Sequence, residues 1–108
     1  MEYEKFDEIR QKLCLEFIEV SEGKMMSSPA IHYNKKVFAF LSKKNKMVFK
    51  LGKNAPLVAD IELVEFNPFK NKGPLTGWYE VDYAYHSSWE ELAELALNLA
   101  RKSKLVSK

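Results

Sequence analysis

The side chains that could act as nucleophiles, general bases or metal ligands are few in this chain and lie far apart. Its two histidines are His32 and His86, and Cys14 is the single cysteine. No spacing among them resembles a zinc site or a nucleophile paired with its base. The four glycines are scattered, so no phosphate-binding loop is predicted. We therefore predict a protein that is not an enzyme and that has no catalytic residue, metal ligand or cofactor.

Positive charge is concentrated in one segment of the chain. Residues 23 to 59 contain eight lysines and no Asp or Glu, although the net charge of the whole chain is only +2. Such a local charge excess can attract an acidic partner or a phosphate. The lysines that crowd two predicted turns are the candidate binding residues, and we expect these turns to form one basic rim: Lys35, Lys36, Lys43, Lys44 and Lys46.

Two aromatic residues lie between the predicted turns. The alternation of residues 37–41 places Phe38 and Phe40 on one face of a strand, opposite Val37, Ala39 and Leu41. Both faces are apolar, so this strand is either central and covered twice or has an outer face that awaits a partner. On an open sheet face, Phe38 and Phe40 could stack unpaired bases, as in proteins that bind single-stranded nucleic acid. They are therefore candidate binding residues as well.

Several observations favour a solvated lysine surface over a nucleic-acid site. Lysine commonly protects sheet edges and exposed turns. Glu80 and Asp82 share a face of a later strand and could pair across the sheet with Lys50 or its neighbours. The lysine-rich segment also contains no arginine, the residue best suited to phosphate and base contacts. Nucleic-acid binding therefore remains the alternative interpretation, beside an acidic protein partner that the sequence does not identify.

A homodimer is a further alternative. The face expected to carry Phe38 and Phe40 could close a two-fold interface, and aromatic residues are common interface anchors. An equally good interpretation is that the aromatic residues form the core. The later aromatic candidates are Trp78, Tyr79, Tyr83, Tyr85 and Trp89.

Length and composition predict a single soluble domain over residues 1–108. A chain of 108 residues is of ordinary size for one hydrophobic core. A lone cysteine fits a reducing cytoplasm, and the acidic N-terminus is unlike a signal peptide. No apolar run approaches the ~18 residues of a membrane span. We expect a cytoplasmic protein without a membrane partner.

Hydrophobic periodicity predicts an α+β fold. An apolar stripe indicates a first helix over residues 3–21, and a Ser88/Glu91 capping box begins a last helix with an apolar stripe from Trp89 to Ala100. Between these helices the expected elements are strands over 25–33, 37–41 and 47–51, a short helix over 57–64 and a strand over 78–85. In the order α-β-β-β-α-β-α, these form an antiparallel sheet of four or more strands packed by the N- and C-terminal helices.

Three segments of the chain carry a family resemblance, namely Lys24–Ile31, Asn34–Ala39 and Met47–Leu51. They resemble the Met-Phe-Gly-x-Pro, Gly-Lys-x-Phe-Ala and hydrophobic-Lys-Leu segments of the TfoX N-terminal domain family. Residues 66–69, 73–78 and 92–99 follow in the family's order, so the resemblance spans nearly the whole chain. The chain has Met26-Ser27 in place of Phe-Gly, and Lys35 in place of the glycine before the lysine.

The resemblance implies a small α+β domain related in shape to YjbR-like and secretion-chaperone-like folds. It also implies a bacterial regulatory protein with a loose association with competence for DNA uptake, and it supplies no family active site. We therefore expect a small regulatory or binding module that acts through protein–protein contacts. The alternative is a weak nucleic-acid binder that uses the lysine-rich turns.

Overall fold

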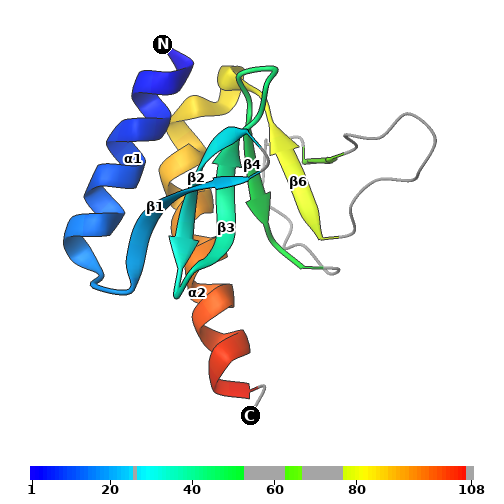
Figure 1. Cartoon of the computed structure of the whole chain (residues 1–108). Helices are drawn as coiled ribbons and strands as arrows, with labels where there is room; N and C mark the ends of the chain where they lie inside the picture. Colours follow the sequence, from blue (N-terminus) through cyan, green and yellow to red (C-terminus); the bar gives the residue numbers. More distant parts are fainter. Residues whose placement is uncertain (26, 53–62, 67–76, 107–108) are drawn as a thin grey trace.

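A six-stranded antiparallel sheet in the order β1-β2-β3-β4-β6-β5 forms the centre of the fold (Figure 1). The structure is a computed structural model that describes residues 1–25, 27–52, 63–66 and 77–106. The elements are α1 (Glu2–Glu16), β1 (Val20–Met25), β2 (Ser28–Tyr33), β3 (Lys36–Leu41), β4 (Met47–Lys50), β5 (Val64–Glu65), β6 (Trp78–Val81), the 3₁₀ helix η1 (Tyr83–Ser88) and α2 (Trp89–Val106). The α+β class and the packing by N- and C-terminal helices are confirmed.

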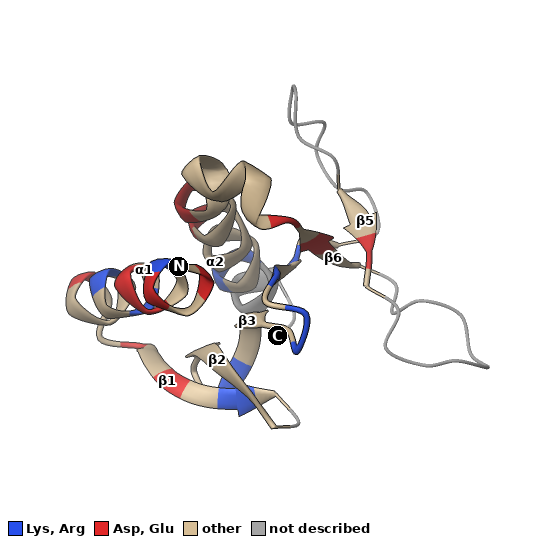
Figure 2. Ribbon diagram, turned by 90° about the horizontal axis from the view of Figure 1, so that it is seen from above, with Lys and Arg blue, Asp and Glu red and all other residues tan. Residues whose placement is uncertain are grey.

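Both α-helices cover the same face of the sheet. The main core joins apolar residues of α1, such as Phe6 and Leu13, with Trp89 and Leu92 of α2 and with alternate residues of the strands. Figure 2 shows α1 over β1, and α2 farther along the sheet. None of the helices in the described part of the chain is long and apolar enough to cross a membrane.

A buried arginine connects α1 to β1. Arg10 is only 7% exposed, and its guanidinium donates hydrogen bonds to Asp7 at 2.8 Å and to the Tyr3 hydroxyl at 3.3 Å. Its Nη2 also lies 4.0 Å from the carboxylate of Glu22, and its Cζ lies 5.1 Å from the centre of the Phe6 ring. Burial lowers the pKa of Arg10, but the hydrogen bond with Asp7 and the charge of Glu22 outweigh it, so the pKa is raised. The carboxylates of Asp7 and Glu22 therefore balance the positive charge of the buried Arg10 guanidinium.

The first helix is shorter than predicted. It ends at Glu16, and Phe17 already has an extended backbone with φ −129° and ψ 120°. Val20 fits the apolar spacing of the predicted helix, but it is the first residue of β1. Its side chain is buried in the main core because it lies on the face of the strand that points to the helices. The predicted strand over 25–33 divides into β1 and β2, which form a hairpin with Met25 opposite Ser28.

The second half of the chain also differs from the prediction in detail. The short helix expected over 57–64 falls almost wholly outside the described residues, and Val64 belongs to β5. The strand expected over 78–85 ends at Val81, because Asp82 starts η1 by accepting a hydrogen bond from the Ala84 amide at 3.2 Å. Ser88 is the last residue of η1, so the chain enters α2 from a 3₁₀ turn instead of from an extended capping residue.

A β-bulge in β3 changes which side chains face the helices. Ile31 pairs with Ala39, but the next residue, His32, pairs with Val37, so Phe38 is an extra residue in β3. A bulged residue breaks strict alternation, because two successive side chains then point to similar sides. Phe38 and Ala39 therefore both join the main core, while Val37 and Phe40 belong to the opposite face.

A second, smaller apolar cluster covers the face of the sheet without helices. Phe40 contacts Phe66 edge-on, with ring centres 5.3 Å apart, and lies 5.7 Å from the ring of Trp78. Ala30 and Val48 complete the buried part of this cluster. The strand β3 is thus central and covered on both faces, which is the first of the two arrangements that its sequence allowed.

Candidate binding pocket

The first lysine-rich turn is a tight two-residue connection between β2 and β3. Tyr33 pairs directly with Lys36, and the two residues between them have positive φ, 50° at Asn34 and 70° at Lys35. Positive φ at both positions is characteristic of the type I′ turn, which matches the twist of a hairpin. Lys35 and Lys36 are exposed, as expected for a turn of this kind.

The second lysine-rich turn is built around a buried serine. Ser42 Oγ accepts hydrogen bonds from the backbone amides of Lys44 and Lys46, each at 3.3 Å. The same hydroxyl lies 3.2 Å from Glu80 Oε2, to which it can donate. Lys46 Nζ lies 3.8 Å from Asp82 Oδ1. An ion pair of the expected kind therefore forms between Lys46 and Asp82, the residue after β6, whereas the sequence suggested Lys50 or its neighbours as the partner. Figure 2 shows where the charged residues lie along the ribbon.

The prediction of one basic rim is wrong, because the two turns lie at opposite ends of β3 (Figure 1). Successive turns of a meander alternate between the two ends of the sheet. The six residues of β3 correspond to a length of about 20 Å. Lys35 and Lys36 are therefore separated from Lys43, Lys44 and Lys46, and the five candidate lysines do not form one surface.

The prediction of an exposed aromatic face is also wrong. Phe38 and Phe40 are each 1% exposed, and they belong to different clusters on opposite faces of the sheet. The physical cause is the bulge at Phe38, which turns its ring toward the helices while Phe40 keeps the outward direction. Neither ring is available to stack on a base or to form the core of a dimer interface.

The histidines and the cysteine have structural surroundings. The ring of His32 lies so close to Gly23 on β1 that a Cβ atom at Gly23 would be 2.0 Å from His32 Cε1. His86 Nδ1 lies 3.0 Å from the Tyr83 carbonyl, and its ring stacks on that of Tyr83. Burial and the charge of Glu22 raise the pKa of the Cys14 thiol, which keeps the thiol protonated and weakly nucleophilic.

A metal centre is likewise not formed in the described part of the chain, where no three His, Cys, Asp or Glu residues are grouped to hold an ion.

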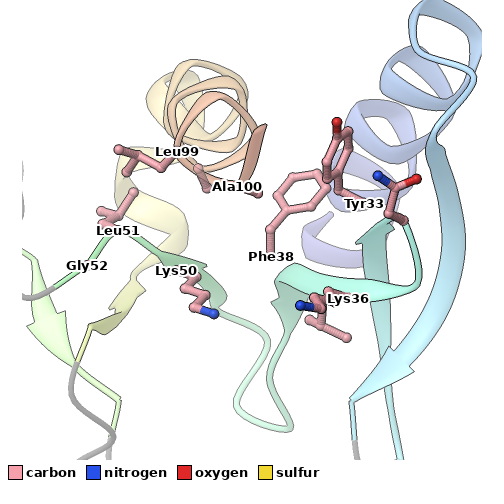
Figure 3. A pocket seen from close by; sticks show the side chains of 11 residues that line it. Tyr33, Lys36, Phe38, Lys50, Leu51, Gly52, Leu99 and Ala100 are labelled. Carbon is pink, nitrogen blue, oxygen red and sulfur yellow. The ribbon is translucent and has the colours of Figure 1, made fainter. Parts of the chain in front are cut away.

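A pocket of about 590 Å³ lies beneath the middle of α2, and we call it the α2 pocket. Figure 3 shows Leu99 and Ala100 of α2 above it, Leu51 on one side and Phe38 on the other, with Lys36 and Lys50 near the opening. The described residues that line the α2 pocket are Tyr33, Asn34, Lys36, Val37, Phe38, Lys50, Leu51, Gly52, Ala96, Leu99 and Ala100.

The α2 pocket occurs where β3 and β4 separate. In the described residues the ladder between them ends at the pair Ala39–Phe49, one residue after the bulge. Beyond that pair, Lys36 and Val37 pair only toward β2, and Lys50 pairs only toward β6. The sheet therefore opens between these two strands, and their side chains cannot fill the space.

Small residues of α2 leave the gap between β3 and β4 unfilled on the side of the helix. The N-terminal half of the helix packs large side chains on the sheet, including Trp89 and Leu92. The middle of the helix presents Ala96 and Ala100, which are four residues apart and so lie on the same side of a helix. An alanine covers less of the facing surface than a leucine or a tryptophan, so a cavity remains over Phe38.

The backbone at the opening is fixed by a shared carbonyl. The amides of Leu51 and Gly52 both donate to the Gly77 carbonyl, at 2.8 and 3.1 Å. Gly52 has φ +85°, with open space around the position of a Cβ, so glycine is favoured there for its conformation and not for lack of room. This shared carbonyl fixes the end of β4 beside Lys50.

The opening of the α2 pocket is basic. Lys36 and Lys50 are both exposed, and none of the described lining residues is acidic. Lys50 Nζ lies 5.9 Å from the centre of the Trp78 ring, on the face of the sheet opposite the helices. The arrangement combines an apolar base with positive charge at one end, which can hold an anion with an apolar body.

Sequence reasoning identified Lys36 and Phe38 as candidate residues but did not predict the α2 pocket. Leu51 and Gly52 were interpreted only as the end of a strand and the start of a loop, and Lys50 only as a further lysine of the basic segment. The signal that was present is the change along the last helix from large residues to Ala96 and Ala100. The sequence alone did not show that these alanines lie over the bulge in β3, because the bulge follows from the pairing of β2 with β3.

Comparison with known proteins gives no relative from which a function could be transferred. No protein-family model, curated protein or solved structure matches the chain. The resemblance to the TfoX N-terminal domain family therefore stays a prediction from the sequence.

Proposed function

We propose that this chain is a non-catalytic binding module and that its ligand site is the α2 pocket. The observation that carries the proposal is an open, mostly apolar cavity of about 590 Å³ in a domain whose other large apolar side chains are mostly buried. Its volume falls within the range of about 300–1,000 Å³ that is usual for small-molecule sites. A cavity of this size leaves apolar surface in contact with water, and a ligand would cover that surface.

The pocket supports a small ligand better than the macromolecular partners that the sequence suggested. The lysine-rich turns lie at opposite ends of the sheet, and Phe38 and Phe40 are buried. These residues give a nucleic acid no continuous surface and give a second copy of the chain no aromatic patch. A regulatory role through a protein partner, and a homodimer that uses other residues, stay predictions from the sequence.

The proposal can be tested by screening neutral and charged fragments against the ¹⁵N-labelled protein. Fragments that bind are expected to shift the amide signals of Phe38, Gly52 and Leu99, because these residues surround the cavity. The variant Ala100→Phe should abolish these shifts by filling the space below the helix. Its matched control is Asn98→Phe, an exposed residue of the same helix that is outside the lining.

Thermal unfolding of both variants would show that each is folded before binding is compared. Shifts that occur only elsewhere, for example in the turn around Lys44, would contradict the proposal. So would fragment binding that Ala100→Phe leaves unchanged.

A further inference from the structure

We infer that the α2 pocket takes an amphipathic carboxylate, with the apolar body under α2 and the carboxylate at the opening between Lys36 and Lys50. The inference rests on the proposed function and adds the chemical class of the ligand. It follows from the distribution of polar and apolar groups around the cavity, which is uneven from base to opening.

The part of the pocket beneath α2 is mainly apolar, and the polar groups of the described lining other than the two lysines belong to Tyr33 and Asn34 of the neighbouring turn. Phe38, Leu51 and Ala96 are almost fully buried and present carbon atoms, and Leu99 and Ala100 add further aliphatic surface from α2. A polar or charged group placed there would lose its contacts with water and gain no hydrogen-bond partner from these side chains. The inner part of the ligand is therefore a hydrocarbon chain or ring.

The opening favours one anionic group. Lys36 on β3 and Lys50 on β4 lie on the two sides of the gap where the strands separate, and the Lys50 ammonium group lies on the Trp78 side of the sheet, so the carboxylate would sit at the end of the gap away from α2 (Figure 3). Each carries a flexible four-carbon stem with an ammonium group, which can adjust to a carboxylate without a fixed bidentate geometry. With no acidic side chain among the described lining residues, the field at the opening is positive.

The carbonyl end of α2 does not cancel this field. Helix-dipole effects are confined to the last turn, and α2 continues to Val106, beyond the residues that line the pocket. The two lysines are exposed to solvent, so each is expected to strengthen binding only about two- to threefold. Together they should give a carboxylate a preference of about fivefold over a neutral ligand with the same body.

The matched ligand pair for the experiment is octanoate and octan-1-ol, which have the same chain length and differ in the charge of the head group. Each would be titrated into the ¹⁵N-labelled full chain at neutral pH, with dissociation constants taken from the shifts of Phe38, Gly52 and Leu99. We expect octanoate to bind about fivefold more tightly, and we expect the preference to fall as salt is added. A short single-stranded oligonucleotide would be titrated in the same way and should not shift these signals.

The charge-neutralising variant is Lys36→Gln with Lys50→Gln. It should remove most of the preference for octanoate and leave the affinity for octan-1-ol unchanged. The matched control is Lys43→Gln with Lys44→Gln, which removes two lysines at the opposite end of β3 and should retain the preference. All four lysines are exposed, and the single variants would be measured if either double variant proved unstable.

The outcomes separate this inference from the proposed function. Equal binding of octanoate and octan-1-ol to the unmodified protein would overturn the carboxylate assignment but leave the α2 pocket as a ligand site. A preference that survives in Lys36→Gln/Lys50→Gln would also overturn it. Tighter binding of the oligonucleotide at the same amides would replace it with a nucleic-acid site. Failure of all three ligands, together with failure of every screened fragment, would overturn both proposals.

Discussion

Lys35 occupies a backbone conformation that most residues avoid. At φ 70° it is the second of two left-handed residues in the turn from β2 to β3, and the first is Asn34, which tolerates this region well. A lysine side chain has no such advantage, and the left-handed conformation costs a residue with a Cβ about 1–2 kcal/mol. The TfoX-like motif has a glycine at this position, so the turn geometry gives a physical reason for a glycine there.

We expect Lys35→Gly to stabilise the protein by about 0.5–1 kcal/mol. The gain from removing the Cβ is reduced, because glycine is more flexible in the unfolded chain. Urea denaturation followed by tryptophan fluorescence would measure the change.

The matched control is Lys36→Gly, the same substitution one position later, at the first residue of β3. It should destabilise the protein, because glycine is more flexible in the unfolded chain and gains nothing where φ is not positive. Equal effects of the two substitutions would show that the left-handed conformation at Lys35 is not the cause.

At the scale of secondary-structure elements, the hairpin of β3 and β4 depends on one hydroxyl group. Ser42 is 6% exposed, and its Oγ contacts two backbone amides of the turn as well as Glu80 on β6. The serine therefore orders the turn and ties it to the strand next to β4. These contacts add to the two backbone hydrogen bonds that close the turn, from the Ser42 amide to the Lys46 carbonyl at 2.8 Å and from the Asn45 amide to the Ser42 carbonyl at 2.9 Å.

Replacing this serine by alanine, Ser42→Ala, should lower the free energy of unfolding by about 1–3 kcal/mol. The two amides and the Glu80 carboxylate would lose their buried partner, and such unsatisfied groups are costly. Thermal or chemical unfolding would measure the loss.

Glu80→Gln is the control, since its amide oxygen can still accept the serine hydrogen bond, and it should cost less than Ser42→Ala. A loss from Ser42→Ala below about 0.3 kcal/mol would contradict this role for the hydroxyl.

Local pattern predicted the elements better than it predicted their pairing. The apolar stripes identified α1 and α2, and the turn residues located the hairpins around Lys35 and Lys44. The bulge at Phe38 was beyond such reasoning, because it exists only in the register between β2 and β3. The same limit explains why Phe38 and Phe40 were placed together and why the α2 pocket was not found.

At the scale of the whole molecule, the lysine-rich segment is folded so that its charges are divided. Lys35 and Lys36 lie at one end of β3, and Lys43 and Lys44 at the other, while Lys46 is paired with Asp82. A sequence dense in lysine therefore yields two small basic sites instead of one broad surface. The strength of any nucleic-acid binding is limited accordingly.

A short single-stranded oligonucleotide should bind weakly and with a shallow dependence on salt. If the two lysines of one turn make the phosphate contacts, the slope of log K against log salt should be about −1.4. Fluorescence anisotropy over a range of salt concentrations would measure it. A slope near −3.5, as expected if five lysines contacted phosphates together, would show that both turns act as one surface.

The bulge at Phe38 has a consequence for how this site could arise or disappear. The gap between β3 and β4 follows from one extra residue in a six-residue strand, and no unusual side chain is required to make it. Loss of a single codon in this strand should restore regular pairing and close the gap from the side of the sheet, while composition and net charge stayed almost the same. Among chains with this fold, the presence of a ligand site could therefore be decided by insertion or deletion in β3 as well as by substitution at Ala96 or Ala100.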